Sequence, residues 1–181
     1  MKEVIIIGTI HLNWTPKDEL EKVLSDINPD QVLVELSGEE LNERPRKDSI
    51  RDEMFVAYDW AVRNKKMVDY FDTGDSSLKD GVTGKEPEFL QQELRYKELL
   101  KNYSWKDLNK EKSSNIPEVK KLDDEIEEKY FDKEKSKKRE HAMLDTIRGK
   151  LVEGTNVIVT GAGHLSFFKK EIPDAILPFR D

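Results

Sequence analysis

The sequence of 181 residues contains no cysteine, and this absence excludes disulfide bonds, thiol nucleophiles and zinc–thiolate sites. It also lacks long apolar runs: none approaches the roughly 18 residues of a membrane span. The run that begins at Val4 is too short to be the core of a signal peptide. We therefore expect a soluble, cytoplasmic protein. Histidine is scarce as well, with three residues, so few positions are available for imidazole chemistry.

Charge is abundant but is not of the sign that nucleic acids require. Charged residues make up 38% of the chain and hydrophobic residues 36%, and the formal net charge is −7. A negative chain is a poor partner for phosphate backbones, so we expect no nucleic acid as partner. The apolar residues are grouped rather than diluted, which argues against global disorder. The length fits a single domain over 1–181, with room for an insert.

The grouped apolar residues predict an α/β fold with a mostly parallel central sheet flanked by helices. Strands are expected at 4–7, 31–36, 67–71 and 156–160, because each is a short run rich in apolar or β-branched residues. Helices are expected between them, one opened by Thr15 as N-cap with Pro16 at its first position, and one over 49–64. An alternation of strands and helices favours right-handed parallel crossovers. Residues 172–179 could add an edge strand.

Residues from about 75 to 155 differ in composition and predict a charged helical insert or lid. Lysine and acidic residues dominate, and helices are expected at about 87–103, 104–112 and 117–152. Most of these charges are expected on a solvated helix face. Several apolar groups can pack either on the sheet or on a second copy of the chain, which leaves a homodimer through the insert open. They are Phe89, Leu90, Leu94, Tyr96, Leu99, Leu100, Tyr103 and Trp105.

Two short motifs follow two of the expected strands in the same way. Gly8-Thr9-Ile10-His11 follows the first strand, and Gly161-Ala162-Gly163-His164 follows the last. A glycine permits a sharp exit from a strand and a close approach of another group. The histidine then lies just past the carboxyl end of a strand, where open α/β sheets bind ligands. Independent structural needs rarely repeat such a spacing, so the pair predicts one functional site at this edge.

The second expected strand adds a carboxylate. Glu35 lies within the apolar run 31–36, near its carboxyl end, where a carboxylate is costly unless it is paired, hydrogen-bonded or bound to a metal. A salt-bridged core residue is the structural alternative. If Glu35 faces the same crevice as His11 and His164, two imidazoles and a carboxylate suit a divalent metal with open positions for water. Without a metal, the same trio could perform general acid–base catalysis.

Other residues are weaker candidates. Asp72 ends the third strand and could orient a histidine, or else cap the following loop. Arg139, next to Glu140 on a helix, could bind a substrate carboxylate or pair with Glu35, or be an ordinary surface partner of another charge. The third histidine, His141, is treated as a surface or lid residue.

Four segments together resemble the TraB/PrgY and Tiki families, which form a wider group with the erythromycin esterases and the haem-binding ChaN proteins. These segments are Gly8-Thr9-Ile10-His11, residues 29–36 with Val34-Glu35-Leu36, residues 139–143, and residues 159–164 with Gly161-Ala162-Gly163-His164. The resemblance spans nearly the whole chain, and its specific part is the two Gly-x-x-His motifs in order with Val-Glu-Leu between them.

The resemblance implies an α/β fold with a helical insert and a site made of His11, Glu35 and His164. For Tiki-like members it implies a metal-dependent peptidase, with manganese or cobalt favoured over zinc. TraB/PrgY-like members are linked to binding or clearing peptide signals. The chain departs from the pattern because the arginine that follows Val-Glu-Leu has no clean match, Arg44 and Arg46 being nearest. Many TraB-like members also carry membrane helices, which we do not find here.

Three functions are therefore weighed. The first is a metal-dependent hydrolase of the peptidase type, with a peptide or small-molecule substrate. The second is a metal-free enzyme, similar to an esterase or a transferase, with a histidine as base. The third is a binding protein for a peptide signal or a haem-like ligand, in which the histidines bind and nothing turns over. The carboxylate that accompanies the two histidines favours an enzyme.

Overall fold

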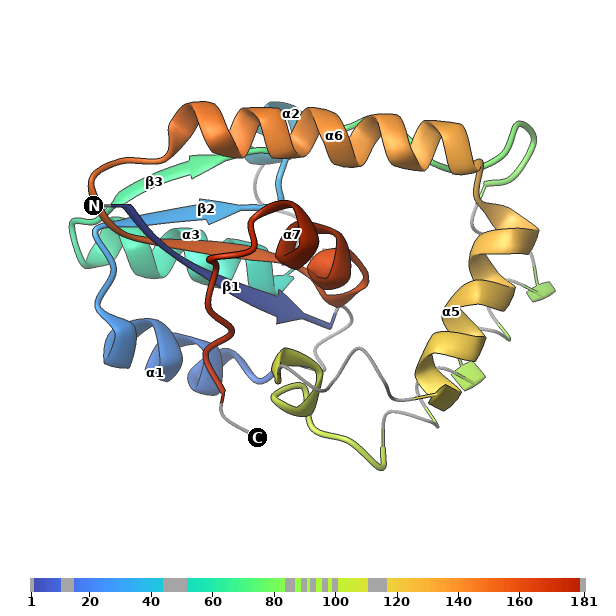
Figure 1. Cartoon of the computed structure of the whole chain (residues 1–181), viewed down its shortest axis with the longest axis horizontal. Helices are drawn as coiled ribbons and strands as arrows, with labels where there is room; N and C mark the ends of the chain where they lie inside the picture. Colours follow the sequence, from blue (N-terminus) through green and yellow to red (C-terminus); the bar gives the residue numbers. More distant parts are fainter. Residues whose placement is uncertain are drawn as a thin grey trace.

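The centre of the molecule is a four-stranded parallel sheet (Figure 1). In this computed structural model the described residues are 2–10, 15–43, 52–83, 101–110 and 117–179, together with 87, 88, 91, 94, 95 and 98. The strands are β1 Lys2–Thr9, β2 Gln31–Val34, β3 Met67–Tyr70 and β4 Gly154–Gly161, in the order β1-β4-β2-β3. The predicted α/β class and parallel sheet are confirmed.

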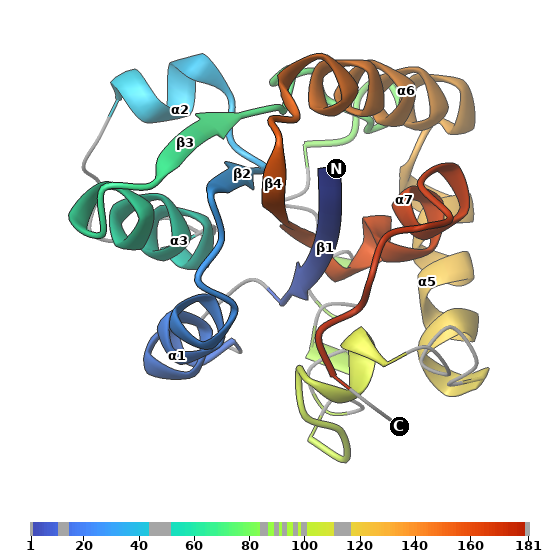
Figure 2. The same cartoon turned by 60° about the vertical axis from the view of Figure 1, so that its left-hand side comes forward.

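Helices cover both faces of this sheet (Figure 2). Helices α1 (Lys17–Ile27) and α3 (Asp52–Arg63) lie on one face, and α6 (Lys133–Lys150) and α7 (Leu165–Glu171) lie on the other. The short α2 (Gly38–Asn42) follows β2, and α5 (Pro117–Tyr130) precedes α6. Two 3-10 turns complete the described elements, η1 (Asp107–Asn109) and η3 (Ala162–His164).

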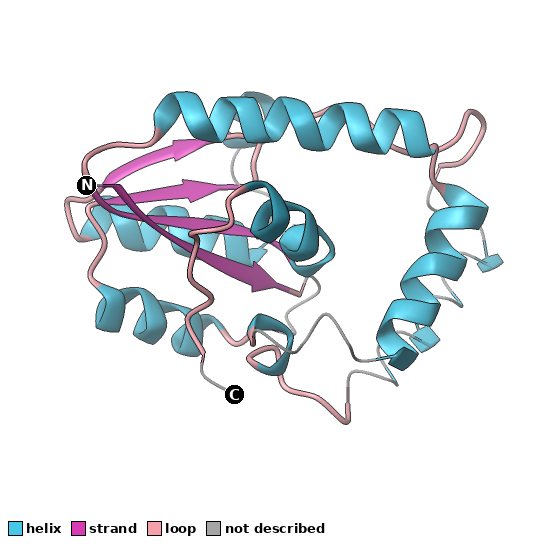
Figure 3. Ribbon diagram, in the orientation of Figure 1, coloured by secondary structure: helices cyan, strands magenta, loops and turns pink. Residues whose placement is uncertain are grey.

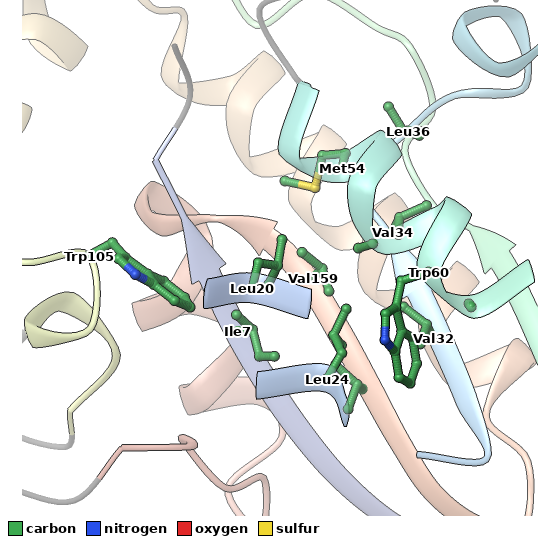
Figure 4. Close-up of a cluster of buried hydrophobic side chains, with 13 residues drawn as sticks. Ile7, Leu20, Leu24, Val32, Val34, Leu36, Met54, Trp60, Trp105 and Val159 are labelled. Atoms are coloured by element: carbon green, nitrogen blue, oxygen red, sulfur yellow. The ribbon is translucent and has the colours of Figure 1, made fainter. Parts of the chain in front are cut away.

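Each face of the sheet has its own hydrophobic core. Alternate strand residues such as Val32 and Val34 face α1 and α3, with Leu20, Leu24 and Trp60 packed on them (Figure 4). Leu33 points the other way, toward Met143 and Phe168 of α6 and α7. All four residues of β2 are buried, as expected for a parallel strand covered on both faces.

Three predicted elements are wrong in detail. The long helix over 117–152 is broken at Phe131–Asp132, because the Asp132 side chain accepts hydrogen bonds from the N–H groups of Glu134 and Lys135 and starts α6. Residues 104–112 do not form a continuous α-helix; turns and the 3-10 turn η1 occupy 104–110. The expected edge strand over 172–179 is reduced to one bridge, between Ile5 and Ile176.

The predicted N-cap is also wrong. Helix α1 begins at Lys17 after Pro16 and has no side-chain cap, because the Thr15 hydroxyl accepts a hydrogen bond from the N–H of Ile10 instead. The structure also adds two helices that the sequence pattern did not indicate, α2 and α7. Helix α2 starts with a capping box, in which Ser37 and Glu40 bond each other's backbone N–H groups.

Residues 78 and 131 of the expected insert lie side by side and form a neck, although Trp105 between them also packs into the core. An antiparallel bridge joins Leu78 to Phe131, flanked by hydrogen bonds from Lys79 N to Tyr130 O and from Asp132 N to Ser77 O, each 2.9 Å long. After the neck, α6 runs along the sheet (Figure 3), so its second half belongs to the core and not to a free insert. Within the described residues, no helix is long and apolar enough to cross a lipid bilayer.

We expect Leu33→Ala to destabilise the protein by about 2–5 kcal/mol, because it opens a cavity in a fully buried central strand. Leu94 is the matched control: it is 59% exposed, so the same change there should alter stability by less than about 0.5 kcal/mol. Urea unfolding of both variants measures the difference. Equal losses would contradict the assignment of the core.

Candidate functional site

The strand order brings the two Gly-x-x-His motifs to neighbouring strands. Strand β4 lies between β1 and β2, with Gly8 paired with Thr160 and Thr9 with Gly161. On the other side of β4, Val34 pairs with Val159, and Glu35 N donates a 3.0 Å hydrogen bond to Val159 O. The carboxyl ends of these three strands therefore meet at one edge of the sheet, with Gly8, Glu35 and Gly161 side by side.

Glu35 directly follows β2 and its side chain is 2% exposed. Its Oε2 atom accepts a 2.6 Å hydrogen bond from Thr160 Oγ1 and a 2.8 Å bond from Gly161 N. Its Oε1 atom accepts a 3.2 Å bond from the guanidinium of Arg139. The buried carboxyl group thus has specific hydrogen-bond donors, which offset the cost of its desolvation.

Arg139 links the carboxylates of two strand ends. Its guanidinium donates to both oxygens of Asp72, at 2.9 and 2.7 Å, and also reaches Glu35. Its side chain is 12% exposed, so Arg139 is the predicted partner of Glu35 and not a surface residue. The pKa of Arg139 is raised although burial opposes this, because both carboxylates favour the charged form. Asp72 also accepts a 3.3 Å bond from Gly74 N, as expected for a loop cap.

His164 lies in η3 and points into the same group. Its Nδ1 atom is 2.9 Å from Glu140 Oε1, and its Nε2 atom is 3.6 Å from Glu35 Oε1. Burial alone would lower the pKa of His164, but Glu35 and the hydrogen bond to Glu140 together raise it above its ordinary value. The structure therefore brings Glu35, Asp72, Arg139, Glu140 and His164 together. Of these, Arg139 and Glu140 come from adjacent positions of α6.

His11, the first predicted histidine, lies outside the described residues, as do Arg44 and Arg46. His141 is exposed on α6 and packs edge-on against Phe167, with ring centroids 5.3 Å apart, in line with the surface role expected of it. Among the described residues, no three histidine or acidic side chains form a group that could hold a metal ion. The described part of the site thus offers two converging ligand atoms, His164 Nε2 and Glu35 Oε1.

Carboxylates are prominent among the described contacts at this edge. Arg139 contacts the carboxylates of Glu35 and Asp72, and the carboxylate of Glu140 contacts His164. Burial raises the pKa of Glu127 on α5, and Glu140 and Asp124 raise it further. Nearby carboxylates thus contribute to the raised pKa of both His164 and Glu127, and the same negative charges favour a bound cation.

The geometry of the two converging atoms is compatible with a metal ion. Two ligands at about 2.0–2.2 Å from a tetrahedral ion are separated by about 3.3–3.6 Å. The 3.6 Å between His164 Nε2 and Glu35 Oε1 lies at the upper end of this range. The carboxylate that holds Nδ1 also fixes the ring as metal-binding histidines require. His164 and Glu35 fit a divalent ion, provided that a third ligand comes from outside the described residues.

Sequence reasoning missed three polar residues at this edge. Thr160 bonds Glu35, and Thr9 donates to Thr160 O at 3.2 Å while lying 3.4 Å from the buried carboxylate of Glu53. The side chain of Asn109, from the insert, accepts a hydrogen bond from Gly8 N and donates one to Gly8 O. The position of each threonine beside a motif glycine could have been a signal, whereas Asn109 lies 101 residues from Gly8 and gave none.

Comparisons of the chain with models of protein families, with curated proteins and with solved structures found no match.

Gly8 and Gly163, one from each motif, have different surroundings. We therefore expect them to differ in how well they tolerate an added methyl group. A Cβ added at Gly8 would lie 2.6 Å from Leu165 Cγ, whereas one added at Gly163 would meet nothing within 4 Å. We expect Gly8→Ala to cost about 1–3 kcal/mol, because the overlap must push β1 and α7 apart. The matched Gly163→Ala should stay within about 0.5 kcal/mol of the wild type. Chemical unfolding compares them, and equal stability would contradict the close packing of Gly8.

The raised pKa of His164 predicts a pH-dependent stability in protein kept metal-free with a chelator. Because the folded-state pKa lies above the unfolded value of about 6.5, the stabilisation is fully present below that pH and is lost as pH rises through the folded pKa. His164→Gln should remove this dependence. Unfolding free energies measured across the pH range test it, and a wild-type profile that gains stability over the same range would contradict it.

Proposed function

We propose that the protein is a metal-dependent hydrolase whose site is built from His164, Glu35 and His11. The observation that carries the proposal is the convergence of His164 Nε2 and Glu35 Oε1, 3.6 Å apart, with the His164 ring held by the carboxylate of Glu140. The similarity of the two Gly-x-x-His motifs to Tiki-like and TraB/PrgY-like proteins supports a peptide bond as the bond cleaved. His11 would supply the third ligand.

The chain's own residues have distinct tasks in this proposal. Glu140 holds the His164 ring so that Nε2 faces Glu35. Thr160 and Gly161 hold Oε2 of Glu35, while Oε1, which accepts a hydrogen bond from Arg139, is the oxygen that faces His164. Asp72 in turn neutralises Arg139, which reduces its repulsion of a bound cation. When bound, a divalent ion supplies Lewis acidity for hydrolysis.

Divalent metal should stabilise the wild-type protein against heat. At a free Mn²⁺ or Co²⁺ concentration of about 100 times Kd, binding adds about 2.7 kcal/mol to the free energy of unfolding. His164→Ala and His11→Ala should each abolish this gain, because each removes a ligand. The control is His141→Ala, which removes an exposed histidine of the same helix that carries Arg139 and should keep the gain. Melting curves unchanged by Mn²⁺, Co²⁺ and Zn²⁺ would reject the proposal.

A metal-free acid–base enzyme is the second candidate, and the Glu140–His164 pair favours it. A carboxylate that orients Nδ1 and raises the pKa of an imidazole is also the arrangement of a general base. Chelation separates the two candidates. Hydrolysis of peptide or ester substrates that stops with chelator and returns with Mn²⁺ supports the metal enzyme, whereas hydrolysis that survives chelator supports the metal-free one.

A further inference from the structure

Two separate parts of the chain bond the outer edge of β1. One is a backbone segment near the C-terminus, and the other is the side chain of Asn109. Near the start of the strand, the C-terminal segment pairs with it: Ile6 N donates to Ile176 O and Ile176 N donates to Val4 O, both at 2.9 Å. Near the end of β1, the side chain of Asn109 is the hydrogen-bonding partner instead. Its Oδ1 accepts from Gly8 N at 2.5 Å and its Nδ2 donates to Gly8 O at 2.7 Å.

The Asn109 side chain thus acts as one more peptide group of a neighbouring strand. A carboxamide offers the same donor and acceptor as a backbone peptide, so it can satisfy both polar groups of one edge residue. Asn109 is fully buried, and its Nδ2 also donates to Trp105 O at 2.9 Å. The residue that it bonds is the glycine of the Gly-x-x-His motif that ends at His11.

The position of Asn109 is itself fixed by the rest of its segment. Trp105 is 4% exposed and packs into the core beside Ile7 and Leu20 (Figure 4). Its Nε1 donates to Glu19 Oε2 at 3.2 Å, and Lys106 Nζ lies 2.6 Å from the same oxygen. Asn109 therefore reaches Gly8 from a segment anchored on α1, which makes its amide a pre-organised clamp.

The clamp acts on the second motif as well, through Gly8. Because Gly8 has no Cβ, its backbone lies directly against the side chain of Leu165, the residue that follows His164. A shift of Gly8 would therefore be transmitted to the start of α7. We propose that Asn109 is a positioning residue, which holds the end of β1 and, through Leu165, the His164 turn in the arrangement that the site requires.

The chain offers a matched control at the opposite end of the same strands. Asn156 is also fully buried, and its amide donates to the backbone oxygens of Glu3, Val152 and Gly154 at 2.9–3.2 Å while accepting from Val152 N. Asn156→Ala and Asn109→Ala thus each remove a buried carboxamide that bonds backbone groups, Asn109 near the end of β1 and Asn156 near the start of β1 and β4. The two variants differ in the end of the sheet at which these hydrogen bonds are lost.

The test compares these two variants by native-state hydrogen exchange of the metal-free protein and by Mn²⁺ affinity. Asn109→Ala should speed exchange at residues 6–9 and 160–165 and weaken Mn²⁺ binding at least about tenfold, the loss typical of supporting residues around metal ligands. Asn156→Ala should speed exchange at residues 2–4 and 154–157 and leave Mn²⁺ affinity within about twofold. If Asn109→Ala does not fold, Asn109→Asp, which keeps the acceptor and loses the donors, is compared with Asn156→Asp.

The same exchange pattern in both variants, or equal Mn²⁺ affinities, would overturn the positioning role. The affinity measurement rests on the proposed function, but the exchange measurement does not. If the wild type binds no Mn²⁺, the proposed metal site fails, and the location of faster exchange still decides whether Asn109 holds this edge of the sheet.

Discussion

The Glu35 carboxylate inside the core is the constraint around which the carboxyl edge of the sheet is arranged. A buried carboxylate is tolerated only when its oxygens find charged or hydrogen-bonding partners. Thr160 and Gly161 of β4 supply two donors and Arg139 of α6 supplies a third. These partners connect β2, β4 and α6, so the residue that carries the negative charge also fixes the relative positions of three elements.

From that centre the interactions extend to both motifs. Arg139 requires Asp72 to balance its charge, and the next residue of α6, Glu140, orients His164. The His164 turn leads into Leu165, which packs on Gly8. The two Gly-x-x-His segments are thus joined by direct packing as well as by strand pairing. Although burial opposes it, the carboxylates of Glu35 and Glu140 raise the pKa of His164.

The local patterns predicted what depends on local forces. The β-branched runs identified all four strands, and the apolar position of Glu35 indicated a buried, paired carboxylate, with Arg139 as one suggested partner. The patterns did not predict that β4 inserts between β1 and β2, because strand order depends on long-range packing. They also placed a continuous helix across Asp132, where a side-chain cap, next to the bridge between Phe131 and Leu78, starts a new helix.

Asn109 shows why the remaining part of the site was hidden from sequence reasoning. Nothing in residues 104–110 resembles a motif. A helix was expected there, with its charges solvated and with Trp105 packed on the sheet or on a second copy of the chain. Their role arises because Trp105 is buried against α1 and brings the neighbouring amide to the edge of β1. Segments that lie far apart in the chain therefore complete the backbone pairing of Gly8. A functional edge in an α/β fold can in this way depend on one side chain whose sequence context gives no sign of it.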